Sequence, residues 1–412
     1  MLFVLASLPK LLRALPKLYK TSKISLMSIF VFILVALSGL FSDIYKARSA
    51  LLVASVALLS GLLLTSWWYV ANELPAAKYK PLIKILLIAG CIYGVLSILQ
   101  FVFAGFGHET FGLLCKNCSS QVFGFPRING FAAEPQFHAN ALLIYFFIGL
   151  GVFYKSRTRL ALSCTLLSLV GIGLAFSRGA YLALGLCTFL FFLLLGIKKQ
   201  IKFKDLIRDI IVFFVTGLVV TGLFIASASY RYRSTPDIAY KTLRSMVEQV
   251  SGGVIELPAS KSEVGVFTPT GLVKASSQER SDAAKVGVRA WNMNVRTRLI
   301  GVGLGNLGPF VINHLDSNAP NNLTIYIFYA LLLSEIGLVG LGAFLLLHLN
   351  ILKKFLASFW KQKDIAIYIG LLCLGIAFLI QYWFFGTYIN TSYVWLWFGI
   401  LLGLGSINKK AL

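Results

Sequence analysis

The chain has 412 residues, of which 58% are hydrophobic and only 13% are charged, and its mean hydropathy is +0.81. Soluble domains carry about 25% charged residues, so the composition excludes an ordinary soluble protein and indicates an integral membrane protein. The formal charge of +23 does not indicate a nucleic-acid partner, because the basic residues cluster at the ends of apolar blocks. We find no helix-turn-helix, zinc-finger or aromatic RNA-binding motif.

The first twenty residues mix apolar and basic side chains. They do not resemble a secretory signal peptide, because the basic residues follow the apolar run and there is no cleavage site of small residues. The pattern predicts either an amphipathic helix on the cytoplasmic surface of the membrane or a poorly ordered N-terminus.

About ten apolar blocks follow, each close to the roughly twenty residues that a transmembrane helix needs. We therefore predict an all-α integral membrane protein with about ten, and up to about twelve, transmembrane helices. The block at 323–349 is long, which makes it a candidate for a bend or a break. The blocks lie near 24–42, 49–70, 83–106, 137–154, 159–176, 179–197, 209–228, 323–349, 366–386 and 393–407.

One long polar stretch, Ser229–Asn322, divides the chain into three parts. Residues 1–228 are predicted to form an N-terminal bundle of about seven helices, residues 229–322 a large loop, and residues 323–412 the C-terminal helices. With the N-terminus inside, the inner segments hold 22 Lys and Arg, the short outer loops hold 5, and the large loop holds the other 11. The positive-inside rule then puts both termini in the cytoplasm and the large loop outside, where we interpret it as the cover of an active site.

Two helices are expected in the large loop. Apolar side chains at i, i+3, i+4 and i+7 predict an amphipathic helix, and these are Leu243, Met246, Val247 and Val250. A second helix is predicted from about Ser277 to Asn294, with Ser276 or Ser277 as its cap and Glu279 in its first turn. The Gly-, Ser-, Pro- and Thr-rich stretch 251–275 reads as an exposed linker. Residues 301–308 (GVGLGNLG) lack the strand–helix context of a Rossmann fingerprint and read as a flexible return to the membrane.

The six cysteines carry little chemistry. Cys91, Cys164, Cys187 and Cys373 fall in apolar blocks and are interpreted as packing residues. Cys115 and Cys118 form a CKNC stretch in an outer loop, where a disulfide is plausible in an oxidising compartment and a redox role has a weaker case.

The stretch from Arg127 to His138 leads into the fourth apolar block. Glu134 stands directly before Pro135, and an acid followed by proline suits the start of a helix. Glu134 is therefore either a pre-organised catalytic carboxylate or a helix cap.

Arg178 lies in the short turn Ser177-Arg178-Gly179-Ala180 between two apolar blocks. A guanidinium is always charged and binds phosphate through two parallel hydrogen bonds. The alternative is that Arg178 snorkels to lipid headgroups.

Arg280 and Arg289 are nine residues apart in the large loop. On one straight helix they point in opposite directions, about two and a half turns apart, so they bind one phosphate together only if Gly287 breaks the helix. We favour Arg280, against the alternative that both are solvated surface charges.

The last candidate region is Asn321-Asn322 followed by Glu335 and Gly337. A carboxylate within an apolar block is expensive and is a functional candidate by default, with a hydrogen-bonded helix kink beside Gly337 as the alternative. His314, just upstream, is either a base or a surface residue.

The sequence shows no metal-ligand spacing, because the four His are scattered, and no P-loop. What remains is a set of arginines with one or two carboxylates at an outer membrane surface. Such a set suits a substrate with a diphosphate and a lipid tail: the arginines would stabilise the leaving diphosphate, and a carboxylate or His would take the proton of an attacking hydroxyl.

At these residues the sequence resembles the O-antigen polymerase and O-antigen ligase family of bacterial membrane glycosyltransferases. The resemblance rests on the order and spacing of short motifs along nearly the whole chain. These are Arg127, Gly130, Glu134 and Pro135, then Ser177-Arg178-Gly179-Ala180, Arg280, the GVGLGN stretch, and Asn322 with Glu335 and Gly337.

The resemblance implies a helical, GT-C-like membrane glycosyltransferase fold with a large periplasmic loop in the bacterial inner membrane. It implies a polyprenyl-diphosphate-linked glycan as donor and no metal, cofactor or nucleotide sugar. The Glu134-Pro135 form is closer to the polymerases of O-antigen, capsule or exopolysaccharide, and the ligases usually carry His-Asn where this chain has Asn321-Asn322. Chain-length regulators or flippases of the same pathway are the implied protein partners.

The sequence therefore favours a polymerase that joins lipid-linked repeat units. Arg178 and Arg280 are the expected diphosphate ligands, with Arg127, Arg289, Asn321 and Asn322 behind them, and Glu134 is the first choice of base, ahead of Glu335 and His314. Two alternatives remain open, a ligase that transfers glycan to lipid A core or protein, and a transporter or flippase of lipid-linked sugars. The transporter ranks third because no internal repeat is visible.

Overall fold

The computed structural model describes residues 2–38, 46–75, 78–113, 121–122, 125–199, 203–231, 269–317, 323, 325–359, 365–384 and 392–406. Over these residues the protein is a helical membrane protein with one pair of two-residue strands. The helices divide between two compact units. The first unit comprises Met1–Lys78, Glu279–Lys363 and Tyr382–Leu412, and the second comprises Tyr79–Gln278 and Asp364–Gln381.

The first unit is built on three apolar helices. These are α2 (Lys23–Ser38), α13 (Phe328–Phe359) and α15 (Ser392–Ser406), and they meet through the rings of Phe32, Phe344 and Trp395, with centroids 5.6–6.1 Å apart. The same unit contains α1 (Leu2–Thr21), α3 (Lys46–Trp68) with the π-helical turn η2 (Tyr69–Glu73), α11 (Val295–Ile300) and α12 (Leu307–His314). The helix α10 (Pro269–Trp291) enters this unit at Glu279.

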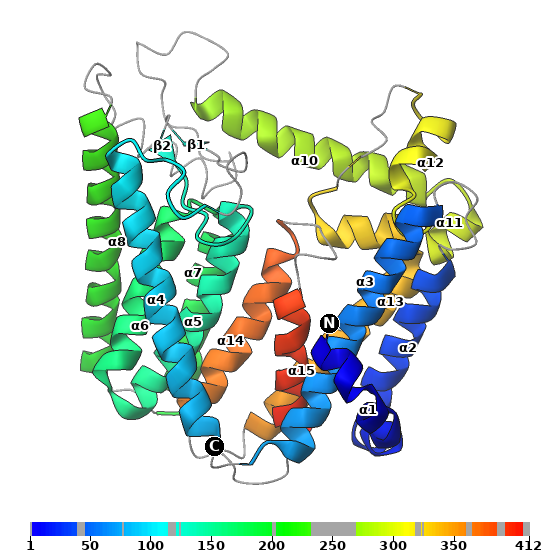
Figure 1. Ribbon diagram of the computed structural model, residues 1–412, viewed down its shortest axis with the longest axis horizontal. Coiled ribbons are helices and arrows are strands. Elements are labelled where there is room, and N and C mark those ends of the chain that lie inside the picture. Colours follow the sequence, from blue (N-terminus) through cyan, green and yellow to red (C-terminus); the bar gives the residue numbers. More distant parts are fainter. Residues whose placement is uncertain are drawn as a thin grey trace. The chain divides into compact units, whose positions relative to one another are not determined.

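The second unit is a bundle in which α4 (Tyr79–Gly105), α5 (Pro135–Ser156), α6 (Arg159–Leu174) and α8 (Phe203–Arg231) run side by side (Figure 1). The helices α7 (Arg178–Ile197) and α14 (Ile365–Gln381) pack on α5 and on each other. Strands β1 (Gln121–Val122) and β2 (Phe125–Pro126) pair antiparallel before the loop that enters α5. Glycines allow the close packing, since a Cβ at Gly370 would lie 2.4 Å from the carbonyl oxygen of Phe147.

Each of the ten apolar blocks identified in the sequence contains a helix. Among the described residues, five helices are long and apolar enough to cross a membrane: Arg48–Glu73, Tyr79–Gly105, Pro135–Ser156, Arg178–Ile197 and Phe328–Ser358. Shorter apolar helices are Lys23–Ser38, Arg159–Leu174, Ile365–Gln381 and Ser392–Ser406. A membrane-embedded helical protein is thus confirmed, whereas the count of about ten crossings stays a prediction.

Three local predictions are confirmed, and the predicted start of the loop helix is wrong. The N-terminal segment is the helix α1, and the long C-terminal block is broken at Gly337 (φ 65°, ψ −168°). Of the four cysteines interpreted as packing residues, Cys164, Cys187 and Cys373 are buried and Cys91 is half-buried. The loop helix expected from Ser277 instead begins at Pro269, so neither Ser276 nor Ser277 is its cap and residues 269–275 are not a linker. Proline is favoured at a first helical position, and the following Gly271–Ala275 segment continues the helix. The predicted helix at 243–250, Cys115 and Cys118 lie outside the described residues.

Candidate functional site

In the second unit, the side chain of Arg127 ties the loop before α5 to the end of α6. Its Nε donates to the carbonyl oxygen of Ala175 at 3.0 Å, and its Nη2 donates to that of Phe176 at 2.7 Å. The Ile128 N–H adds a bond to the carbonyl oxygen of Leu174 at 3.3 Å. Because the last carbonyls of a helix lack intrahelical partners, Arg127 satisfies groups that α6 leaves open. The predicted diphosphate ligand therefore has a structural task as well.

Gln100 of α4 fixes the middle of the same loop. Its amide nitrogen donates to the carbonyl oxygen of Gly130 at 3.1 Å, and its amide oxygen accepts from the Gly130 N–H at 2.9 Å. Gly130 has φ +58° and lies over the buried ring of His138, so that an added Cβ would fall 2.1 Å from its Nδ1. Only glycine fits this backbone and this space. His138 in turn shares a hydrogen bond of 2.9 Å with the Ser97 hydroxyl.

Apolar packing also holds the loop before α5 in place. The Ile128 side chain is buried in a cluster from α4, α6, the α6–α7 turn and α8, whose other members are Phe101, Ala104, Leu174, Phe176 and Val220. Burying such a side chain contributes about 1.5–3 kcal/mol, which adds to the polar ties of Arg127 and Gln100. The loop is therefore held at three points.

Glu134 stands at the start of α5, as the sequence predicts. It is the N-cap residue with extended backbone (φ −135°, ψ 150°), and Pro135 occupies the first helical position. Its carbonyl oxygen accepts from the His138 N–H at 3.2 Å, whereas its exposed carboxylate makes no capping bond. The Glu134 carboxylate thus makes no hydrogen bond to the start of α5 and is accessible to solvent, as a base that accepts the proton of a substrate hydroxyl must be.

Arg178 is the first residue of α7, and its side chain is half-buried. The turn before it is tight because Phe176 adopts a left-handed backbone (φ 48°), which is uncommon outside glycine. The N-terminus of a helix carries partial positive charge, and an arginine there adds a full one. This end of α7 therefore favours an anionic group such as a phosphate.

These contacts bring two of the predicted motifs together in the second unit. The Arg127 side chain reaches 48 and 49 residues along the chain to the two carbonyls just before Ser177-Arg178. The sequence motif that begins at Arg127 and the turn that carries Arg178 are thus neighbours in space, with Glu134 at the end of the same pinned loop.

In the first unit, Arg280 lies on α10 against an aromatic surface. Its guanidinium carbon is 5.2 Å from the ring centroid of Tyr326, and its Nη1 donates to the carbonyl oxygen of Phe384 at 3.3 Å. A cation over an aromatic face is stabilised by the ring quadrupole. Nearby, the exposed Trp383 contacts Tyr329 with ring centroids 5.2 Å apart. Arg280 is thus oriented by its neighbours.

Arg289 does not join Arg280. The helix α10 continues unbroken through Gly287, which is buried against Ile325, where an added Cβ would fall 2.3 Å from Cδ1. The nine-residue spacing therefore puts the two arginines on opposite faces, about half a turn apart, and Arg289 is exposed. The prediction that they cannot bind one phosphate from a straight helix is consistent with this geometry.

The glycine-rich stretch 301–308 does not match the expectation of a flexible return, because it is buried and bonded to the break in α13. The N–H groups of Val302 and Gly303 donate to the carbonyl oxygens of Ser334 and Glu335, both at 2.9 Å. The Gly305 N–H donates to Oε1 of Glu335 at 3.0 Å. Glycines 301, 303 and 305 all have positive φ, a backbone conformation that glycine adopts without a steric penalty.

Glu335 is only 4% exposed, and its carboxylate accepts from the backbone of this stretch. The side chain of Arg48 also lies there, since an added Cβ on Gly305 would fall 3.1 Å from its Cγ. A hydrogen-bonded role beside the Gly337 kink, the alternative kept open in the sequence, has direct structural support. Its role as a catalytic base stays a prediction.

The other base candidate, His314, is the last residue of α12 and is exposed. Its ring stacks on Phe310 with centroids 4.4 Å apart, and its Nδ1 bonds to the carbonyl oxygen of Phe310 at 3.0 Å. Because that carbonyl is an acceptor, Nδ1 carries the proton and Nε2 is the basic nitrogen.

Asn321 and Asn322 lie outside the described residues, which contain no group of three metal-ligating side chains.

Sequence reasoning missed three residues that organise these sites. Gln100 is a polar residue within an apolar block, and that position was the signal that could have drawn attention to it. Tyr326 lies beneath Arg280, a contact that no local pattern predicts. Asp209, at the start of an apolar block, is bound by two arginines and is described below.

No protein-family model matches this sequence, and no curated protein is significantly similar to it.

Proposed function

We propose that this protein is a polysaccharide polymerase of the bacterial inner membrane, which transfers a polyprenyl-diphosphate-linked glycan onto a lipid-linked repeat unit at the periplasmic face. The product would be O-antigen, capsule or exopolysaccharide. The supporting observation is the tie of Arg127 to Ala175 and Phe176, which holds the loop that carries Glu134 beside the turn that carries Arg178. An open carboxylate and a cation at a helix N-terminus are the groups that this transfer needs.

In the proposed reaction, an acceptor sugar hydroxyl attacks the anomeric carbon of the donor. Glu134 takes the hydroxyl proton, the new glycosidic bond forms as the bond to the diphosphate breaks, and polyprenyl diphosphate leaves. Arg178 stabilises the charge that develops on the leaving diphosphate. Arg127 acts as a positioning residue, because its guanidinium already binds two backbone carbonyls.

The proposal is tested with purified protein in detergent and with lipid-linked repeat units extracted from the bacterium that carries the gene. Neither metal nor nucleotide sugar is added, and products are separated by chain length. A ladder of products supports polymerisation. Transfer that occurs only when lipid A core is supplied would make the protein a ligase, and sugar movement across reconstituted vesicles without any transfer would make it a transporter.

Arg178→Ala is the sharpest variant, and Arg159→Ala is its matched control. Both arginines are the first residues of apolar helices, α7 and α6, in the same unit. Loss of one charge-stabilising donor in a transition state costs about 10²–10³ in rate, so Arg178→Ala should lose the ladder while Arg159→Ala keeps it. Equal product from both variants at equal expression would refute the assignment of Arg178.

A further inference from the structure

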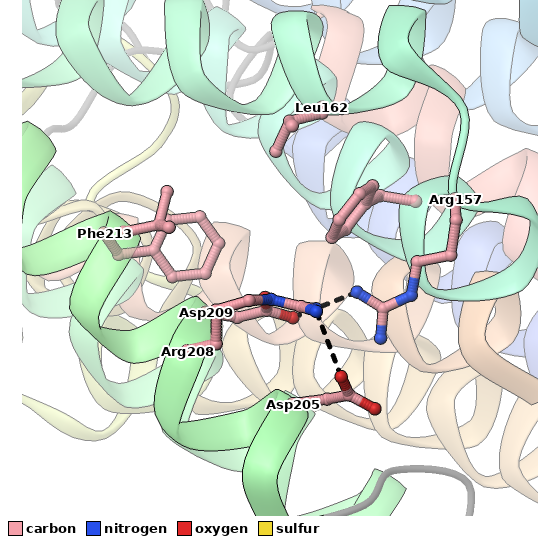
Figure 2. Close-up of a pocket in the computed structure, with 8 residues that line it drawn as sticks. Arg157, Leu162, Asp205, Arg208, Asp209 and Phe213 are labelled. Atoms are coloured by element: carbon pink, nitrogen blue, oxygen red, sulfur yellow. Dashed lines mark hydrogen bonds and ion pairs between the residues drawn. The ribbon is translucent and has the colours of Figure 1, made fainter.

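A cavity of about 620 Å³ lies in the second unit, at the end of α5 opposite to Glu134. Its walls come from the last turn of α5, the start of α6 and the first turns of α8 (Figure 2). The lining residues are Phe153, Arg157, Leu162, Asp205, Arg208, Asp209, Val212 and Phe213. An α5 of 22 residues places this cavity about 33 Å along the helix from the proposed catalytic loop, so it belongs to a different site.

One wall of the cavity is a charged cluster around Asp209. This carboxylate is buried, and it accepts from the Tyr154 hydroxyl, from Nη1 of Arg157 at 3.1 Å, and from Nε and Nη2 of Arg208 at 2.9 and 2.8 Å. Arg208 also pairs with Asp205 at 3.1 Å. Figure 2 shows Arg157, Arg208, Asp205 and Asp209 pointing toward one another at this wall.

The two guanidiniums are fixed but keep donors for a ligand. Arg157 lies over the rings of Phe153 and Tyr154, at 4.6 and 4.5 Å, and its side chain is 39% exposed. The Arg208 side chain is 55% exposed. Each guanidinium carries five N–H groups, more than the bonds described above use. Two fixed arginines side by side suit the oxygens of a phosphate.

The charge around the cavity and its apolar walls indicate which kind of phosphate compound it binds. The cluster itself is neutral, but Lys155 and Arg159 are exposed close by along the chain, so the region favours an anion. The other lining side chains are apolar. On α8, the flanking Ile207, Ile210, Ile211 and Phe214 are 43–66% exposed, as expected of a surface that faces lipid. A phosphate with an apolar tail fits this combination better than a free ion does.

We propose that this cavity binds an anionic phospholipid, with the headgroup phosphate on the exposed N–H groups of Arg157 and Arg208 and the start of an acyl chain against Leu162, Val212 and Phe213. The bound lipid would join the α5–α6 turn to α8 and anchor this end of the second unit in the membrane. The inference does not depend on the proposed glycosyltransferase activity.

The test is native mass spectrometry of the full chain released from detergent after addition of phosphatidylglycerol, phosphatidylcholine or glycerol 3-phosphate. Arg208→Gln removes one guanidinium, and Lys204→Gln is its control, because Lys204 lies one turn away on α8 and does not line the cavity. Val212→Trp fills the apolar part without touching the ion pairs, and Val215→Trp is its control on the same helix.

We expect phosphatidylglycerol to be retained in preference to phosphatidylcholine. Arg208→Gln and Val212→Trp should each weaken its binding by about fivefold or more, whereas both control variants leave it unchanged. Equal loss in Lys204→Gln would show general surface attraction, equal binding of phosphatidylcholine would show recognition of the tail alone, and tight binding of glycerol 3-phosphate would show a site for a free phosphate. Each of these three results would overturn the proposal.

Discussion

Gly301 and Gly337 show how closely two backbones approach each other in the first unit. A Cβ on Gly301 would fall 2.3 Å from the carbonyl carbon of Glu335, and one on Gly337 would fall 2.4 Å from that of Leu299. Both residues also have positive φ, at 75° and 65°. Each position therefore requires glycine for two separate reasons: an added Cβ has no space, and the backbone conformation is strained for a residue with a side chain.

Gly337→Ala should lower the free energy of unfolding by about 2–5 kcal/mol, the sum of a left-handed backbone and a crowded Cβ. Gly342→Ala is the matched control, since Gly342 is on the same helix and has nothing within 4 Å of an added Cβ. That control should be neutral or about 0.5–1 kcal/mol more stable. The measurement is thermal melting in one detergent at one scan rate, because membrane proteins often unfold irreversibly. Similar melting of the two variants would contradict the close approach.

Among whole elements, α13 is the one on which most of the first unit depends. It packs on α2, α11 and α15, and its break at Gly337 exposes the carbonyl oxygens of Ser334 and Glu335 to the N–H groups of Val302 and Gly303. A broken helix leaves backbone groups that need new partners in a dry interior. The stretch 301–306 supplies them.

Glu335→Ala should destabilise this junction by about 1–3 kcal/mol, because the buried Gly305 N–H loses its acceptor. Glu335→Gln keeps an acceptor oxygen and should destabilise it less. Melting in detergent gives the stability, and the product ladder measured on the same samples gives the activity. A Glu335→Gln variant that melts normally but makes no ladder would show that the Glu335 carboxylate takes part in the reaction, and Glu134→Gln would then decide which of the two is the base.

The elements were largely predictable from the sequence because apolar blocks of fixed length specify helices locally, and Glu335 with Gly337 marked the break in α13. Contacts between distant residues were not predictable. Nothing near Arg127 in the sequence indicates Ala175, and the ion pair of Arg157 with Asp209 joins residues 52 apart. The start of α10 was missed because residues 251–275 were judged by overall composition, although Pro269 is a helix-start residue. In the candidate site, residue types were predictable and their partners were not.

For the whole molecule, the division of basic residues predicts its direction across the membrane. The inner segments hold 22 Lys and Arg against 5 in the short outer loops, and this asymmetry favours both termini in the cytoplasm. The same orientation would put Glu134 and Arg178 in the periplasm and the Arg157–Arg208 cavity at the inner leaflet, where anionic lipids carry the negative surface potential.

Reporter fusions test this orientation. An alkaline phosphatase fused after residue 200 should be inactive, because that enzyme folds only in the periplasm, and a fusion after residue 275 should be active. A fluorescent protein fused at the same two positions should give the opposite result and controls for expression. Activity of the phosphatase at residue 200 would invert the chain and move the proposed active face to the cytoplasm.

The contacts of Leu304 and its neighbour show how late in synthesis the first unit can close. The carbonyl oxygen of Leu304 accepts from the Ser49 hydroxyl, 255 residues earlier in the chain. The N–H group of the neighbouring Gly305 donates to the Glu335 carboxylate, 30 residues later. The second unit, by contrast, is almost one continuous run of chain, lacking only α14. During synthesis, most of the second unit can therefore assemble before the ribosome has made α13 and α15, on which α2 and α3 pack. Synthesis of the first unit begins before that of the second unit and ends after it. The early helices of the first unit must therefore be stable without their later partners, or be held by an insertion chaperone, until translation ends.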